Sequence, residues 1–287
     1  MLSQEFMRNA LLAGTPIAIA CALGGWFVVL RGQLFAGDAL SHVAFPGALA
    51  AASVGIDQRV GLLLGTVLAA ALIAVLGRGS LSLRGGRAGS MPSDDTAIGV
   101  VFTFILGLGL FFLTRYGMSS AGTGGIQAAR TLFGSIFGLG AGEARLTAAV
   151  ALAVVLALGV IARPLLFASV APDVAAARGV PTRLLGVAFL VLLGVIAAAA
   201  TQAVGALLLL GLLGGPAATA HNLTRSPATG IALAILLALV ACWGGLALAY
   251  AIPSLPPSSA IVCIAGAVYY LSMVASRVRV AGGRPHR

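Results

Sequence analysis

Long apolar runs dominate the chain and recur at the length of a membrane-spanning helix. A helix needs roughly 20 predominantly apolar residues to cross the hydrocarbon core of a bilayer. Only Thr201 and Gln202 interrupt the apolar stretch 184–220, so the pattern allows eight helices as well as nine. Their polar side chains need either a loop or a protein-lined cavity. The pattern therefore predicts an all-α, polytopic transmembrane bundle of eight or nine helices, with spans at residues 9–30, 37–55, 60–77, 96–114, 146–167, 184–200, 203–220, 228–250 and 258–275.

The composition agrees with a surface that faces lipid. Only 8% of the 287 residues are charged, and the mean hydropathy is +1.09. Soluble domains carry about 25% charged residues, so this chain has too few charges to cover a water-exposed surface of its size. We expect a single transmembrane domain over residues 1–287. The sequence contains no Walker A motif, no HExxH motif and no nucleophile–base pair, which predicts neither an enzyme nor a bound cofactor.

The net charge of +10 predicts an orientation rather than a nucleic-acid partner. No arginine run is interleaved with aromatic residues, as single-strand binding would require. If the N-terminus lies outside, twelve arginines fall in inner segments and five in outer ones. Positive residues collect on the cytoplasmic side. We therefore expect a multi-pass protein of a bacterial cytoplasmic membrane with its N-terminus outside and its C-terminus inside.

Asp38 and His42 are the acid and the histidine that fall within a predicted span. Their spacing of four residues places both on one helical face. A carboxylate at bilayer depth costs about 2.5–3.5 kcal/mol and should line a cavity or find a partner. Carboxylate and imidazole together suit manganese, iron or zinc, and Pro46, one turn later, can free a backbone carbonyl. Two alternatives stay open: the pair hydrogen-bonds to itself, or the helix starts later and both residues lie in a loop.

Two further polar segments border predicted spans. Ser93, Asp94 and Asp95 precede the apolar run from Thr96, where they are typical of a helix N-cap with acids at the positive end of the dipole. Metal release on the inner side is the alternative for Asp94 and Asp95.

The loop 168–183 contains a short predicted helix from Pro172 to Arg178, with Asp173 in its first turn and Gly179 as its stop. Such a helix could dock a partner or lie at the membrane interface as a connector.

Four segments resemble the ABC-3 family, the membrane permeases of zinc and manganese ABC importers. They are Leu30-Arg31 with GDALSHVAFPG at 37–47, SDDTAIG at 93–99, LFGS at 132–135, and VGALL through PAATA at 204–220.

The resemblance implies a permease that passes a divalent metal ion between two permease subunits, as a homodimer or with a second permease. A cytoplasmic ATPase dimer would drive it, and an extracytoplasmic binding protein would deliver the ion. It also implies that Asp38 and His42 are the metal ligands. The ATPase-coupling residues would be Ala171, Pro172, Asp173, Ala177, Arg178 and Gly179, although the family's usual Phe-Asp is replaced here by the stretch 168–173.

Two other functions compete with this interpretation. A permease for a metal chelate, such as a siderophore or cobalamin, would not need an Asp–His pair in its wall. An ion-coupled secondary transporter would need intramembrane ionisable groups, and only Asp38 and His42 qualify. The sequence does not distinguish manganese, zinc and iron, because the same ligands serve all three.

Overall fold

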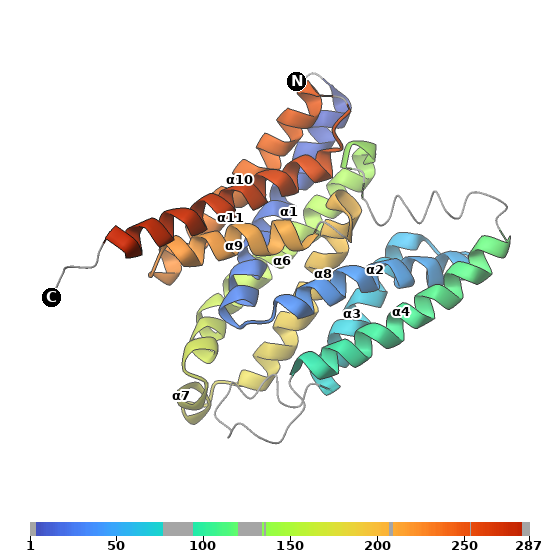
Figure 1. Cartoon of the computed structure of the whole chain (residues 1–287). Coiled ribbons are helices and arrows are strands. Elements are labelled where there is room, and N and C mark those ends of the chain that lie inside the picture. The colour runs from blue at the N-terminus through green and yellow to red at the C-terminus, as the bar shows by residue number, and fades with distance from the viewer. Residues whose placement is uncertain are drawn as a thin grey trace.

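The computed structural model describes residues 4–76, 94–119, 134, 136–206, 209–252 and 254–282, and these are almost entirely helical (Figure 1). Within those ranges there is no β-strand. The helices, with one short 3-10 turn η1 (Ile136–Gly138), are α1 (Glu5–Leu30), α2 (Leu34–Val54), α3 (Gln58–Leu76), α4 (Asp94–Ser119), α6 (Ala141–Val170), α7 (Pro172–Ala177), α8 (Thr182–Val204), α9 (Leu209–Leu223), α10 (Pro227–Ala251) and α11 (Pro257–Gly282).

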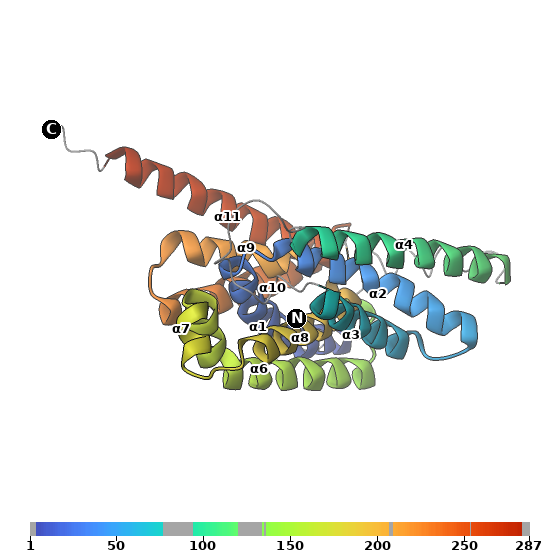
Figure 2. The ribbon, with the colours of Figure 1, turned by 90° about the horizontal axis from the view of Figure 1, so that it is seen from below.

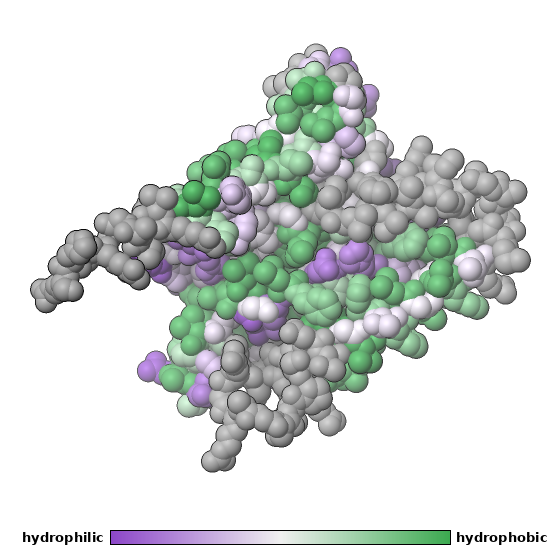
Figure 3. All heavy atoms as spheres, viewed as in Figure 1, coloured by the Kyte–Doolittle hydropathy of each residue, from purple (hydrophilic) through white to green (hydrophobic). Residues whose placement is uncertain are grey.

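Each of the nine predicted spans corresponds to one of the long helices, which confirms the all-α membrane bundle. Seven helices of the described part are long and apolar enough to cross a membrane: α1, α2, α3, α6, α8, α10 and α11. In α4 the apolar part runs from Ile98 to Thr114, and α9 has only 15 residues. Much of the surface in Figure 3 is accordingly apolar, with small polar areas among it.

Helix α1 lies in the middle of the bundle, with α6, α8, α9 and α10 packed around it (Figure 2). In its most apolar window 78% of the residues are buried, against 22% for α6 and 28% for α11. The outer helices instead expose leucine and valine, for example Leu156 and Val160 of α6. Small buried residues therefore form the helix contacts inside the bundle, and the large aliphatic side chains of the outer helices lie on its surface, where they can contact lipid.

Helix α2 is held against its neighbours by close backbone contacts. A Cβ atom added to Gly47 would lie 2.5 Å from the carbonyl oxygen of Gly61 in α3, so only glycine allows the two helices to approach this far. On the other side, a Cβ atom on Gly109 of α4 would lie 2.6 Å from Cγ of Pro46. Small residues that let helix backbones touch are the usual means of packing in lipid. The contacts fix α2 between α3 and α4.

The boundary between α8 and α9 differs from the sequence prediction. Of the two environments expected for the polar side chains of Thr201 and Gln202, a loop is wrong: both residues belong to α8, which continues to Val204, and Gln202 lines a cleft between helices. The break comes at Gly205, whose φ of +93° ends the helix. The side-chain amide of Gln202 is tolerated because it accepts a hydrogen bond from Thr147 of α6, at 3.3 Å, whereas the hydroxyl group of Thr201 is buried without a hydrogen-bond partner in the described structure.

Helix α7 confirms the short helix predicted between two spans. It begins at Pro172, which occupies the first turn, and Gly179 follows it with a φ of +77°. Backbone N–H groups of Gly179 and Val180 donate to the carbonyls of Ala176 and Ala175 and close the end. Because α6 enters α7 and α8 leaves it, α7 lies at one end of the bundle (Figure 1).

Candidate functional site

Helix α2 carries both Asp38 and His42, so the alternative that they lie in a loop is wrong. The helix begins at Leu34 and places Asp38 in its second turn. The hydroxyl group of the buried Ser41 donates a hydrogen bond to the carbonyl oxygen of Asp38, at 2.6 Å. The side chains of Asp38 and His42 therefore project from adjacent turns of one continuous helix.

The Asp38 and His42 side chains face each other without forming a hydrogen bond. Oδ1 of Asp38 lies 3.8 Å from Nε2 of His42, beyond hydrogen-bond range. Their side chains are 33% and 23% exposed, so both remain accessible from one side. A zinc ion binds carboxylate oxygen and imidazole nitrogen at roughly 2.0–2.2 Å each. The observed gap is therefore close to the span that one ion could bridge.

Pro46 modifies the helix next to this pair. Proline has no N–H, so the carbonyl group of His42, four residues earlier, loses its usual helical donor. The proline ring packs against Gly109 of α4. The backbone oxygen of His42 is therefore a further acceptor next to the imidazole and carboxylate groups.

Two aromatic side chains, which the sequence analysis did not identify, border the pair. The ring of Phe102 in α4 lies 5.8 Å from the imidazole of His42 and 6.3 Å from the ring of Phe35 in α2. Phe35 precedes Asp38 by three residues, on the same side of α2. That spacing could have indicated Phe35, whereas Phe102 comes from another helix and carries no sequence signal.

Phe102 restricts the orientation of the His42 ring, which yields a prediction. An aromatic contact contributes about 0.5–1.5 kcal/mol, so if His42 is a metal ligand, Phe102→Ala should weaken metal binding by roughly two- to tenfold. Equilibrium binding of manganese to the purified protein measures this change. Phe104→Ala is the matched control, since Phe104 is 66% exposed on the same helix. Equal affinity in wild type and Phe102→Ala would show that the contact does not restrain His42.

Arg31 closes the turn between α1 and α2 near this region. Its guanidinium lies 5.3 Å from the ring of Phe189 in α8, and Nε and Nη1 are buried without a hydrogen-bond partner in the described structure. Burial lowers the pKa of Arg31 below its ordinary value, although a guanidinium stays protonated. Arg31 therefore adds a fixed positive charge at the start of α2.

The other predicted site residues are only partly placed. Asp94 and Asp95 form the first turn of α4, but their side chains and all of Ser93 lie outside the described residues. His221 stacks on Trp26 and its Nε2 lies 3.1 Å from the Trp26 carbonyl oxygen, which is a packing role. In the described part, no three acidic, histidine or cysteine residues gather as a metal site.

The predicted coupling residues come together at α7. Asp173, Ala177, Arg178 and Gly179 are exposed, while Ala171 and Pro172 are half-buried. Ala175 is fully buried and seats the helix on the bundle, whereas Val174 is 50% exposed. The helix therefore presents a small, mixed apolar and charged surface at the end of the bundle.

The fold defines a polytopic helical membrane protein. The model of the "ABC 3 transport family" matches residues 3–276, and the chain belongs to that family. The manganese transport system membrane protein MntC of Halalkalibacterium halodurans is 29% identical to it, covering 95% of this chain and 88% of that protein. A probable iron transport system membrane protein of Haemophilus influenzae is also 29% identical, covering 97% of each chain.

A solved structure supports the fold. The chain is similar to one in a structure described as PsaBC from Streptococcus pneumoniae in complex with Fab, with a TM-score of 0.81 and 27% identity. The match covers 98% of this chain and 97% of that chain. The chain therefore shares the helical fold of that protein.

Proposed function

We propose that this chain is the membrane permease subunit of an ABC importer that carries a divalent transition-metal ion, manganese, zinc or iron, into the cytoplasm. The observation that carries the proposal is the Asp38–His42 pair, which is partly exposed on one face of a membrane helix. The names of the relatives, manganese and iron transport proteins, support the same class of substrate. The ion is the transported substrate, and ATP hydrolysis belongs to a separate subunit.

Asp38 and His42 act as ligands that replace part of the hydration shell of the ion. A carboxylate and an imidazole bind these three metals with similar chemistry. The negative charge of Asp38 compensates part of the charge of the ion at a depth where an uncompensated charge is costly. Because the side chains remain partly exposed, the ion can arrive and leave without unfolding of α2.

A second copy of the chain completes the coordination shell in this proposal. One chain supplies two side-chain ligands, whereas these metals prefer four or more. In a homodimer with its pathway between the subunits, a second Asp38–His42 pair would supply the others. Asp94 and Asp95, at the first turn of α4, would then receive the ion at the inner side.

Helix α7 is the contact for the cytoplasmic ATPase dimer. It lies at the end of the bundle that the positive-inside rule assigns to the cytoplasm, with the N-terminus outside and the C-terminus inside. An extracytoplasmic metal-binding protein would deliver the ion at the opposite end. A chelate permease or an ion-coupled transporter lacks a comparable reason for both α7 and the Asp–His pair.

Uptake by the reconstituted transporter tests this function. Proteoliposomes that contain the chain and its ATPase, with the metal-binding protein added outside, should accumulate manganese, zinc or iron(II) only when ATP is supplied to the ATPase side, measured by metal analysis of the washed vesicles. Vesicles with a Walker A variant of the ATPase are the control. Uptake driven by a proton or sodium gradient without ATP would contradict the proposal.

A further inference from the structure

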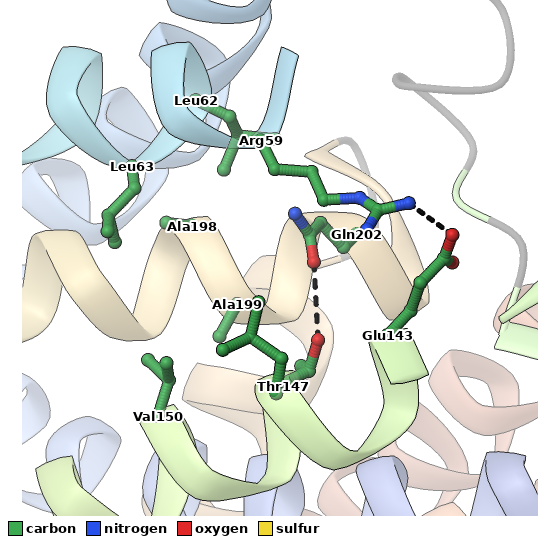
Figure 4. A pocket seen from close by; sticks show the side chains of 10 residues that line it. Arg59, Leu62, Leu63, Glu143, Thr147, Val150, Ala198, Ala199 and Gln202 are labelled. Carbon is green, nitrogen blue, oxygen red and sulfur yellow. Dashed lines mark hydrogen bonds and ion pairs between the residues drawn. The ribbon is translucent and has the colours of Figure 1, made fainter. Parts of the chain in front are cut away.

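A cleft opens between α3 and α6 at the end of the bundle opposite α7, with α8 as its floor (Figure 4). Its empty volume is about 460 Å³, including the space at its open side. The cleft lies away from Asp38 and His42, which do not line it. The lining residues are Arg59, Leu62, Leu63, Glu143, Leu146, Thr147, Val150, Ala198, Ala199 and Gln202.

The mouth of the cleft carries both signs of charge. Arg59, from the first turn of α3, forms an ion pair with Glu143, from the first turn of α6. The two side chains are 44% and 34% exposed, so both can also contact a molecule outside the protein. Beneath them, Oε1 of Gln202 accepts a hydrogen bond from Thr147, and the nitrogen of the amide turns toward the Arg59 side chain (Figure 4).

The body of the cleft is lined by apolar side chains. The floor is formed by Ala198 and Ala199, whose short side chains leave the space unfilled. Leu63 and Leu146 on the walls are 36% and 59% exposed. The exposed aliphatic surfaces of α3 and α6 continue from these walls toward the middle of the membrane, for example at Leu156, which is 70% exposed.

The depth of the cleft corresponds to the boundary between headgroups and hydrocarbon. Seven residues separate Glu143 from Val150, which is about 10 Å along α6, and the hydrocarbon core is about 30 Å thick. Arg59 can keep its guanidinium at the headgroup level while its methylene groups lie along the apolar wall. Hydrogen-bond donors therefore lie above an apolar slot of about 10 Å, which is about two thirds of the hydrocarbon depth of one leaflet.

We propose that this cleft binds a phosphatidylethanolamine molecule of the leaflet opposite α7. Its acyl chain occupies the slot between α3 and α6. The phosphate accepts hydrogen bonds from the guanidinium of Arg59 and the amide nitrogen of Gln202, and the ammonium group lies at the carboxylate of Glu143. The paired charges at the mouth favour a zwitterionic headgroup. An anionic lipid would bind Arg59 through its phosphate but would bring no cation to the carboxylate of Glu143. A bound lipid would hold α3 and α6 at a fixed separation across α8.

Photo-crosslinking in nanodiscs tests the site. The full chain is reconstituted in nanodiscs with phosphatidylethanolamine bearing a photoreactive acyl chain, and crosslinked peptides are identified by mass spectrometry. Crosslinks should concentrate in residues 62–63 and 146–150. Leu63→Trp fills the slot and Arg59→Gln removes the charged donor, and each should reduce these crosslinks by about fivefold or more.

Matched variants make the test specific. Leu64→Trp and Arg145→Gln change neighbouring exposed residues that do not line the cleft, and both should crosslink as wild type does. Unlabelled phosphatidylethanolamine should compete better than phosphatidylglycerol. Equal crosslinking in all variants, or equal competition by the two lipids, overturns the proposal. A photoreactive amino acid placed at Leu63 that crosslinks to a second copy of the chain, and not to lipid, would also overturn the proposal, because protein would then cover the cleft. Metal transport is not measured, so this result is independent of the proposed function.

Discussion

Asp38→Asn and His42→Gln are each expected to reduce ATP-driven metal uptake by more than 100-fold. Even residues that only support a metal ligand change affinity or activity by about 10- to 100-fold when mutated, and these two substitutions remove the ligands themselves. Asn has the size of Asp but not its charge, and Gln approximates the length of His without the imidazole. Both side chains are partly exposed, so the helix should fold with either replacement.

Uptake in proteoliposomes and manganese binding to the purified permease measure this effect together. Binding and uptake should fall in parallel if the pair holds the ion. Asp57→Asn is the matched control, because Asp57 is exposed in the turn before α3 and accepts a hydrogen bond from the backbone N–H of Arg59 at 2.9 Å. Monodisperse elution in size-exclusion chromatography shows that each variant folds. Wild-type uptake in both α2 variants would mean that the metal passes elsewhere.

Val174→Glu in α7 is expected to abolish uptake while metal binding at α2 stays unchanged. Val174 is 50% exposed beside the exposed Asp173 and Ala177. A carboxylate placed in the centre of a small docking surface would have to be desolvated when the ATPase binds, and pairing with Arg178, four residues later, would offset only part of that cost. Transport would then fail because ATP hydrolysis no longer moves the permease, not because the ion site is damaged.

Co-purification of the tagged ATPase with the permease measures docking directly. Val174→Glu should retain less than about one tenth of the wild-type ATPase, which is a loss of about 1.4 kcal/mol. The control is Arg225→Gln, an exposed substitution in the connection between α9 and α10. If the ATPase still binds Val174→Glu and hydrolysis still drives uptake, α7 is not the coupling element.

The residues of α7 illustrate how far local sequence determines structure. Pro172 can begin a helix because it needs no hydrogen-bond donor there, and Gly179 can end it because it adopts a positive φ without strain. Both properties depend on the residue alone, so the prediction of this helix was correct to within one residue. Local sequence was less decisive at Thr201 and Gln202. Their polarity allowed either a loop or a protein-lined cavity, and only the contact of Gln202 with Thr147 of α6 shows that the helix continues there, with the break at Gly205.

The sequence by itself determined the membrane class, the helical bundle and the shared face of Asp38 and His42, because hydrophobic length and helical periodicity are local properties of the chain. Only the tertiary structure decided that Phe102 borders the His42 ring and that Arg59 pairs with Glu143, 84 residues away. Apolar faces in lipid carry no directional signal for which helices become neighbours. Close packing at small residues such as Gly47 and Gly61 makes that choice, and it depends on the shapes of two helices at once.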